Sequence, residues 1–342
     1  MKNITLGSTG ITVPQNGFGA LPIQRISSDD AVTLLRRAYE GGMRFFDTAR
    51  AYSDSEEKVG LALEIYPRNS YFLASKTAAT TPEEFWTQLD TSLKLLKTDY
   101  LDIYQFHCAA TAYRPGDGSG MYECMAEAKR LGKIKHIGIT AHLLQVAFDA
   151  VDSRLYETIQ FPFSYLSSDK EFDLVRKSRE NQMGFIAMKG LAGGLINQAE
   201  PAMAFMAQFD NVLPIWGIQK ASELDDWLAF MDKTPEMNDD IRSFIEKEKI
   251  DLAGDFCRGC GYCMPCPAGI MINQCARMSL MLRRAPSQNW LTEEMQEEMR
   301  KIENCLHCGQ CSKKCPYELD TPALLEKNYE DYKKVLAGEV EV

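Results

Sequence analysis

The chain has 342 residues, of which 45% are hydrophobic and 25% charged, as in ordinary soluble globular proteins. Its formal net charge of -10 at pH 7 repels nucleic acids and anionic membranes, so we expect neither as a partner. Neither a signal peptide nor an apolar run long enough to span a membrane is present in the sequence, which predicts a cytoplasmic protein.

Short apolar runs typical of strands alternate with amphipathic stretches typical of helices from about Leu6 to Phe230. The stretch from Ile4 to Val13 precedes the first predicted strand, near Gly17, and we expect it to form a hairpin that plugs the bottom of a strand barrel. In the first helix we expect Ser28 to be the cap and Gly41 the stop. Eight such strand and helix units predict an α/β fold, a (β/α)8 TIM barrel. The predicted strands lie near Gly17, Phe46, Leu73, Tyr104, Ile139, Ile159, Ile186 and Ile215.

Four titratable side chains follow consecutive predicted strands: Asp47, Tyr52, Lys76 and His107. Active groups of such barrels lie at the carboxyl ends of the strands. An ammonium beside a phenol favours the phenolate, so Lys76 is expected to lower the pKa of Tyr52. Each residue alone is more often an ordinary loop residue, but the four together form a set that can deliver a proton.

These residues lie in the segments FDTARAY, LASKT and LDIYQFH, with LGSTGITV, GFGA and SEEKVG nearby, and here the chain resembles the aldo-keto reductase superfamily. The resemblance implies reduction of a small-molecule carbonyl compound with a nicotinamide cofactor, NADH or NADPH. It makes Tyr52 the general acid, Lys76 and Asp47 its tuning pair, and His107 the residue that orients the substrate. Cys108 and Cys124 are expected to be barrel packing.

The resemblance also implies nicotinamide contacts at the later strand ends. Gln160 matches the amide-binding glutamine of the family, whereas Thr140 stands where the family has Ser-Asn. Met188, followed by Lys189, replaces the aromatic residue that stacks on the nicotinamide. These substitutions leave open a barrel that binds nicotinamide weakly or not at all.

The adenosine side departs from the family in the segment IQKASELDDW. Glu223 stands where the family has a basic residue for the 2′-phosphate, and a carboxylate there repels a phosphate. Lys220 lies near enough to compensate in part, and Asp226 keeps the acidic residue of the adenine-binding pair. These departures favour NADH over NADPH.

Of the 11 cysteines, only Cys108 and Cys124 precede Cys257, and eight of the other nine lie in two runs, CRGCGYCMPCP and CLHCGQCSKKCP. The second run has the C-x₂-C-x₂-C-x₃-C-P spacing of [4Fe-4S] proteins. Because the fourth cysteine of each run ligates the other cluster in two-cluster ferredoxins, we expect two interlocked [4Fe-4S] clusters. Their ligands would be Cys257, Cys260, Cys263 and Cys315 for one, and Cys305, Cys308, Cys311 and Cys266 for the other.

The first run is one residue short before Cys266, so Cys275 is held in reserve as a ligand. Tetrahedral zinc is the alternative to the clusters. A long helical spacer separates the runs, which favours a small, mainly helical dicluster ferredoxin-like domain. The whole chain then resembles the variety of aldo-keto reductase with a C-terminal ferredoxin-like 4Fe-4S domain.

The expected layout is a barrel over residues 1–233, a connecting helix over 234–254, a dicluster domain over 255–320 and a helical tail over 321–342. We expect an iron-sulfur oxidoreductase that accepts electrons from nicotinamide, from its clusters, or from a redox protein partner. Exchange between a two-electron hydride and one-electron clusters needs a flavin or radical step, and the sequence carries no flavin motif. The alternative is an electron-transfer protein whose barrel is a docking or regulatory scaffold.

Overall fold

The computed structural model describes residues 1–252, 256–259, 261–284, 287–315 and 317–342. It divides into two compact units, each described here by itself. The first comprises residues 1–190 and 199–241, and the second comprises residues 191–198 and 242–342. The segment Leu191–Gln198 therefore belongs to the second unit although it lies between two elements of the first.

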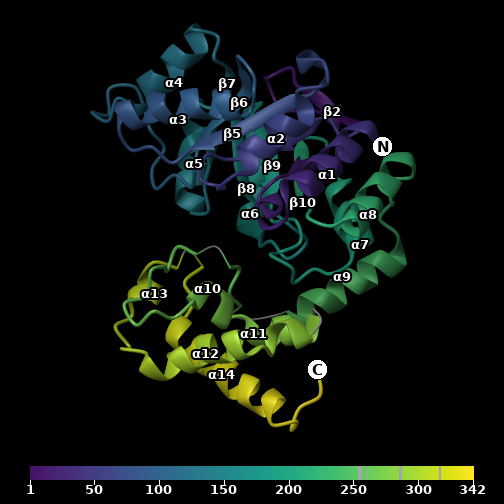
Figure 1. Ribbon diagram of the computed structural model, residues 1–342, viewed down its shortest axis with the longest axis vertical. Helices are drawn as coiled ribbons and strands as arrows, with labels where there is room; N and C mark the ends of the chain where they lie inside the picture. Colours follow the sequence, from purple (N-terminus) through teal and green to yellow (C-terminus); the bar gives the residue numbers. More distant parts are fainter. Residues whose placement is uncertain (253–255, 260, 285–286, 316) are drawn as a thin grey trace. The chain divides into compact units, whose positions relative to one another are not determined.

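The first unit is a closed barrel of parallel strands (Figure 1). The order around the barrel is β10-β3-β4-β5-β6-β7-β8-β9, so every strand after the first is bonded to the strand before it in the chain. This confirms the predicted TIM barrel. Its strands are β3 (Gly17–Gly19), β4 (Phe45–Asp47), β5 (Phe72–Thr77), β6 (Leu101–Phe106), β7 (Ile134–Thr140), β8 (Thr158–Pro162), β9 (Gly184–Met188) and β10 (Val212–Gly217).

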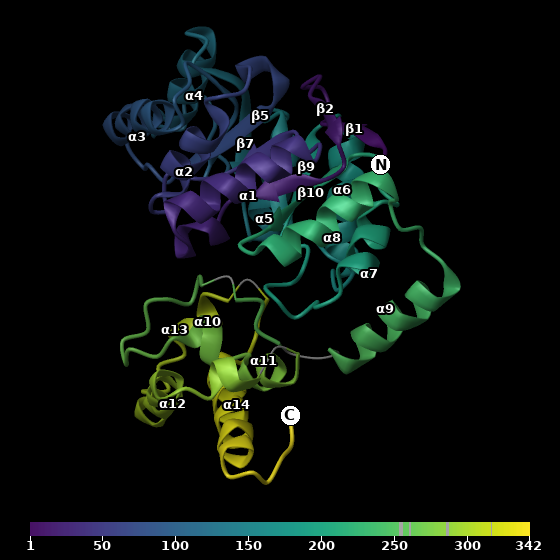
Figure 2. The same cartoon turned by 45° about the vertical axis from the view of Figure 1, so that its right-hand side comes forward.

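Helices surround the barrel and alternate with its strands (Figure 2). They are α1 (Ser28–Glu40), α2 (Ser55–Leu63), α3 (Pro82–Leu95), α4 (Met121–Arg130), α5 (Leu144–Ser153), α6 (Asp169–Glu180), α7 (Ala199–Met206) and α8 (Ala221–Asp232), with the 3-10 turns η1 (Pro22–Arg25) and η2 (Arg68–Ser70). The predicted cap of α1 is wrong by one residue. Ser27, not Ser28, accepts a hydrogen bond from the Asp30 N–H, because its extended backbone turns the hydroxyl toward the helix end. Gly41 follows the helix as expected.

The N-terminal hairpin pairs β1 (Asn3–Thr5) with β2 (Thr12–Pro14). Its apolar residues Ile4, Leu6, Ile11 and Val13 are buried in one cluster with residues of the barrel strands, including Phe45 and Ile103. The expected hairpin is therefore present, and its apolar side chains pack against residues of the barrel strands.

The described part of the second unit is helical. Its elements are α9 (Asp239–Asp251), whose first turn belongs to the barrel unit, α10 (Ile272–Cys275), α11 (Met278–Arg284), η3 (Ser287–Trp290), α12 (Glu293–Arg300), η4 (Lys301–Asn304), α13 (Gln310–Lys313) and α14 (Thr321–Leu336). α14 buries Leu325, Tyr329 and Tyr332 and packs against α10, α11 and α13. Among the described residues, no helix is long and apolar enough to cross a membrane.

Candidate functional site

The loop after β4 carries Tyr52 and is held firmly against β5. The main-chain N–H of Arg50 donates to the carbonyl of Lys76 at 3.1 Å. Underneath, the fully buried Glu56 pairs with Arg50 and accepts a hydrogen bond from the Ser75 hydroxyl at 2.6 Å. Because a buried carboxylate is stable only when its oxygens are bonded, this network fixes the loop and with it the position of Tyr52.

The structure brings together the four residues that the sequence singled out in the barrel. Lys76 Nζ lies 2.5 Å from Asp47 Oδ1, and both side chains are buried. The same ammonium lies 5.2 Å from the centroid of the Tyr52 ring. The rings of Tyr52 and His107 meet edge to face, with their centroids 5.5 Å apart. A phenol, an ammonium, a carboxylate and an imidazole therefore share one site at the strand ends.

The expectation of a lowered pKa for Tyr52 is wrong. The pKa of Tyr52 is raised, because burial disfavours the phenolate and because Asp47 and Cys108 act in the same direction. Lys76 instead donates to Asp47 and to the Thr48 carbonyl, the latter at 2.6 Å. Tyr52 is thus held in its protonated form at neutral pH, the form that a general acid requires.

His107 is held in its neutral form. Burial lowers its pKa to about 3, and the nearby charge of Lys76 acts in the same direction. Its main-chain N–H donates to the Thr77 carbonyl at 2.8 Å, which fixes the residue beyond the end of β6. A neutral imidazole here can donate one hydrogen bond to a substrate oxygen without adding charge.

Sequence reasoning missed Gln105, which completes the environment of Asp47. Its Nε2 donates to Gln160 Oε1 at 2.9 Å and lies 3.4 Å from Asp47 Oδ2. Gly138 leaves the space for it, since a Cβ there would stand 2.8 Å from Gln105 Cγ. The signal was present, because Gln105 lies two residues before His107 and alternate residues of a strand share a face.

The predicted nicotinamide contacts lie at or beside the strand ends. Thr140 and Gln160 are paired residues of β7 and β8, and both are buried. The Thr140 hydroxyl accepts a hydrogen bond from the Cys108 N–H at 2.7 Å. Met188 is partly buried against the barrel interior cluster. Lys189 follows Met188 in the chain. Its charge lies close enough to His142 to contribute to the lowered pKa of that imidazole.

At the start of α8, Glu223 has a structural function. Its carboxylate accepts hydrogen bonds from the N–H groups of Gln219 and Lys220 at 2.8 and 3.1 Å. The carboxylate therefore occupies the helix N-terminus, where anions are stabilised by the free N–H groups. The side chains of Lys220 and Asp226 are exposed nearby.

Two further residues border the site. Cys108, expected to pack inside the barrel, is exposed instead, because it stands just beyond the end of β6 with a left-handed backbone. Its sulfur lies 3.8 Å from His142 Nδ1. Burial lowers the pKa of His142 to about 3, with Lys189 and His107 adding to the effect. Cys124 is buried, as expected.

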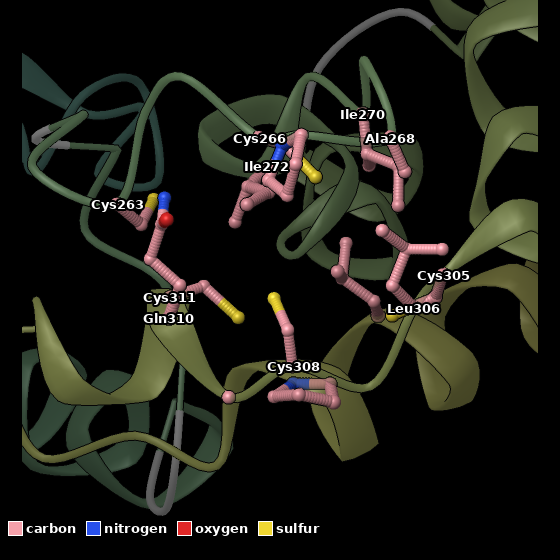
Figure 3. Close-up of a pocket in the computed structure, with 14 residues that line it drawn as sticks. Cys263, Cys266, Ala268, Ile270, Ile272, Cys305, Leu306, Cys308, Gln310 and Cys311 are labelled. Carbon is pink, nitrogen blue, oxygen red and sulfur yellow. The ribbon is translucent and has the colours of Figure 1, made fainter.

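Seven described cysteines of the second unit line two pockets. One is lined by Cys263, Cys266, Cys305, Cys308 and Cys311, and Figure 3 shows the sulfur atoms of Cys266, Cys308 and Cys311 turned toward its middle. The other is lined by Cys257, Cys263 and Cys315. Cys260 lies outside the described residues. Thiols from both runs thus share each pocket, as interlocked clusters require.

The reserve ligand Cys275 is set apart from these pockets. It lines neither of them, its sulfur lies 3.9 Å from the Glu298 carbonyl, and burial raises the pKa of its thiol to about 12. Within the described residues, no three Cys, His, Asp or Glu side chains converge on one ion position.

Comparison with known families identifies both units. Residues 15–253 match the model of the aldo/keto reductase family, which is more than half of the chain. The chain belongs to the aldo/keto reductase family. Residues 256–320 match the 4Fe-4S dicluster domain. The chain therefore has an aldo/keto reductase domain followed by a 4Fe-4S dicluster domain.

Known relatives match part of this chain. L-galactose dehydrogenase of Arabidopsis thaliana is 30% identical over 57% of this chain and 67% of its own length. Methylglyoxal reductase DkgB of Salmonella typhi is 33% identical over 48% of this chain and 62% of its own length. The chain spans 49% to 67% of the length of the first curated relatives that it matches.

Solved structures show the same fold. An aldo-keto reductase from Bacillus halodurans, in its holo form, superposes with a TM-score of 0.63 at 20% identity, over 72% of this chain and 96% of its own. One from Brucella melitensis gives a TM-score of 0.58 at 22% identity, over 72% of this chain and 99% of its own. At these identities the likeness establishes the barrel fold alone.

Proposed function

We propose that this protein is an iron-sulfur oxidoreductase that reduces a small-molecule carbonyl group with Tyr52 as the general acid. The observation that supports this most is the meeting of Tyr52, His107 and the buried pair of Lys76 with Asp47 at the strand ends. Curated relatives named as a methylglyoxal reductase and an L-galactose dehydrogenase support carbonyl or alcohol chemistry as the reaction class.

In the proposed reaction, each residue of the site has a separate task. Tyr52, kept protonated by its raised pKa, donates its hydroxyl proton to the carbonyl oxygen. Neutral His107 donates a hydrogen bond that orients the same oxygen. Lys76, held in place by Asp47, stabilises the negative charge that develops on the phenol. A bound nicotinamide supplies the hydride.

We further propose that Thr140, Gln160, Met188 and Lys189 hold the nicotinamide, with Lys220 and Asp226 near the adenosine. The buried amide of Gln160 is oriented by Gln105, which suits it to one fixed partner. NADH is favoured over NADPH because the carboxylate of Glu223 already occupies the start of α8 and would repel a 2′-phosphate there.

For the second unit we propose two [4Fe-4S] clusters with the interlocked ligand sets. Cys305, Cys308, Cys311 and Cys266 fit one cluster, since all four line one pocket. Cys257, Cys263 and Cys315 line the other pocket, and the sequence adds Cys260. When bound, the clusters would supply single-electron transfer to or from a redox protein partner. The cysteines of both pockets fit iron, because thiolates are the soft ligands that iron-sulfur clusters use. Buried apolar residues such as Ile272 line the same pockets and limit the access of water.

Anaerobic purification followed by nicotinamide titration tests the proposal. Iron and sulfide analysis should give two clusters per chain, and NADH should bind and be oxidised in the presence of small aldehydes or ketones. Tyr52→Phe should remove this oxidation but keep NADH binding, whereas the control Tyr66→Phe, whose hydroxyl bonds Glu40 on the barrel surface, should leave both unchanged. Failure of both nucleotides to bind would favour the electron-transfer alternative.

A further inference from the structure

Arg277, between α10 and α11, has a guanidinium whose hydrogen bonds are incomplete. Its Nη2 donates to the carbonyl of Gly193 at 2.9 Å, within the same compact unit. Its Nε and Nη1 are buried and have no hydrogen-bond partner among the described residues. Burying a donor without an acceptor costs free energy, and more so for a charged group. These two nitrogens therefore indicate an acceptor that the described protein does not supply.

The guanidinium lies against the first cysteine run. A Cβ on Gly259 would stand 2.9 Å from Arg277 Nη1, and one on Gly193 only 2.6 Å from it. Both glycines have a left-handed backbone, with φ of +65° and +69°, so side chains are disfavoured at both positions. Two glycines thus make the space in which the cation rests beside the loop that begins at Cys257.

Arg277 lies close enough to Cys257 for their charges to interact. The neighbouring Arg258 is placed differently, since its guanidinium lies over the rings of Phe256 and Tyr317, at 4.7 and 4.2 Å from their centroids. Arg258 also lines the pocket of Cys257, Cys263 and Cys315, but its guanidinium lies over the two rings. Arg277, beside Gly259, instead keeps two buried nitrogens without a partner among the described residues.

We propose that Arg277 is a positioning residue that raises the reduction potential of the cluster held by Cys257, Cys263 and Cys315. The proposal rests on the cluster assignment given under Proposed function. Reduction adds one negative charge to a cluster, and a buried cation with N–H donors toward its sulfur atoms stabilises the reduced form. Hydrogen bonds to the sulfur atoms are an established means by which a protein sets such a potential.

Redox titration followed by electron paramagnetic resonance tests the proposal on the full chain. Arg277→Gln should lower the potential of one cluster by at least a tenfold change in its one-electron equilibrium, about 59 mV, and leave the other unchanged. Arg277→Lys, which keeps the charge but loses the planar fork, should give a smaller change in the same cluster. The matched control is Arg283→Gln on α11, whose guanidinium bonds Asp331 at 2.6 and 2.8 Å and which should move neither potential.

If Arg277 served only to connect Gly193 to the cysteine loop, its replacement would leave the reduction potentials of the cluster-containing protein unchanged. Unchanged potentials in Arg277→Gln with full iron and sulfide content would therefore overturn the proposal. If that variant loses a cluster, the wild-type protein labelled with ¹⁵N-arginine decides. Coupling of a guanidinium nitrogen to one reduced cluster supports the proposal, and its absence overturns it. A wild-type protein without two clusters would instead overturn the cluster assignment.

Discussion

Lys76 and Asp47 form an ion pair from which water is almost wholly excluded, with 0% and 2% of the two residues exposed and 2.5 Å between Nζ and Oδ1. Burial raises the pKa of Asp47, and the charge and hydrogen bond of Lys76 oppose this. The pair is reinforced by the amides of Gln105 and Gln160, so that the carboxylate has a partner on each oxygen. Its integrity decides whether the ammonium stays beside Tyr52.

Removing either Lys76 or Asp47 from the buried pair should lower the stability of the barrel or the rate of carbonyl reduction. Asp47→Asn leaves the Lys76 ammonium buried without its counter-charge, and we expect the barrel to lose about 3–5 kcal/mol of stability. Lys76→Met should reduce carbonyl reduction by roughly 10²–10⁴-fold, because the charge that assists the phenol is gone. Denaturant unfolding and turnover at saturating NADH measure the two effects.

The matched control for Lys76 is Lys177→Met on α6. Lys177 also pairs with an aspartate, Asp152, at 2.6 Å, but 37% and 52% of the two side chains are exposed. A surface pair of this kind contributes about 0–1 kcal/mol. If Lys177→Met loses as much stability as Lys76→Met or Asp47→Asn, the buried pair contributes no more to stability than a surface pair.

The imidazoles of His107 and His142 should stay neutral at pH values well below the usual pKa of histidine. The pKa values of His107 and His142 are both lowered to about 3 from 6.5. Imidazole nitrogen shifts in ¹⁵N-histidine protein, assigned with His107→Asn and His142→Asn, should remain those of the neutral ring from pH 8 to pH 5. Titration of either ring near pH 6.5 would contradict the burial seen here.

The same shifts predict a loss of stability in acid. Between pH 6.5 and about 3 the unfolded chain binds a proton on each histidine that the folded chain does not bind. The free energy of unfolding should therefore fall as the pH decreases, by up to about 1.4 kcal/mol per pH unit for each residue. His107→Asn and His142→Asn should each reduce this slope.

Cluster loading should separate the ligand cysteines from Cys275. Cys311→Ser removes a thiol from the pocket of Figure 3 and should lower the iron and sulfide content by roughly half, since one of two clusters is lost. Cys275→Ser should keep the full content, because this thiol lines neither pocket. Loss of iron in Cys275→Ser with retention in Cys311→Ser would reverse the assignment.

Glu223 should control the choice between the two nicotinamides. Glu223→Gln keeps an oxygen that can accept the N–H groups of Gln219 and Lys220 but removes the charge. NADPH should bind roughly fivefold more tightly in this variant, the equivalent of about 1 kcal/mol between exposed charges, while NADH binding should stay constant. Fluorescence titration measures both affinities. A tighter affinity for NADH and NADPH alike would argue against repulsion of a phosphate.

Local patterns were sufficient to predict the barrel and the meeting of its four titratable residues. Asp47, Lys76 and His107 each stand where an apolar run ends, and parallel strands in a closed barrel bring such ends together. Gln105 was missed. The alternation of residues along its strand places it on the face of His107, but an amide two residues from a histidine has no chemical signature of its own.

The amino-acid sequence by itself determined the barrel, the four residues at its strand ends and the two cysteine runs, because periodicity and spacing are local properties of the chain. Only the tertiary structure decided that Tyr52 has a raised pKa and that Cys275 stands apart from both cysteine pockets. It alone placed the unpaired nitrogens of Arg277 beside Gly259. Burial and charge at a point in space depend on neighbours that are distant in the chain, and these neighbours are set only when the chain has folded.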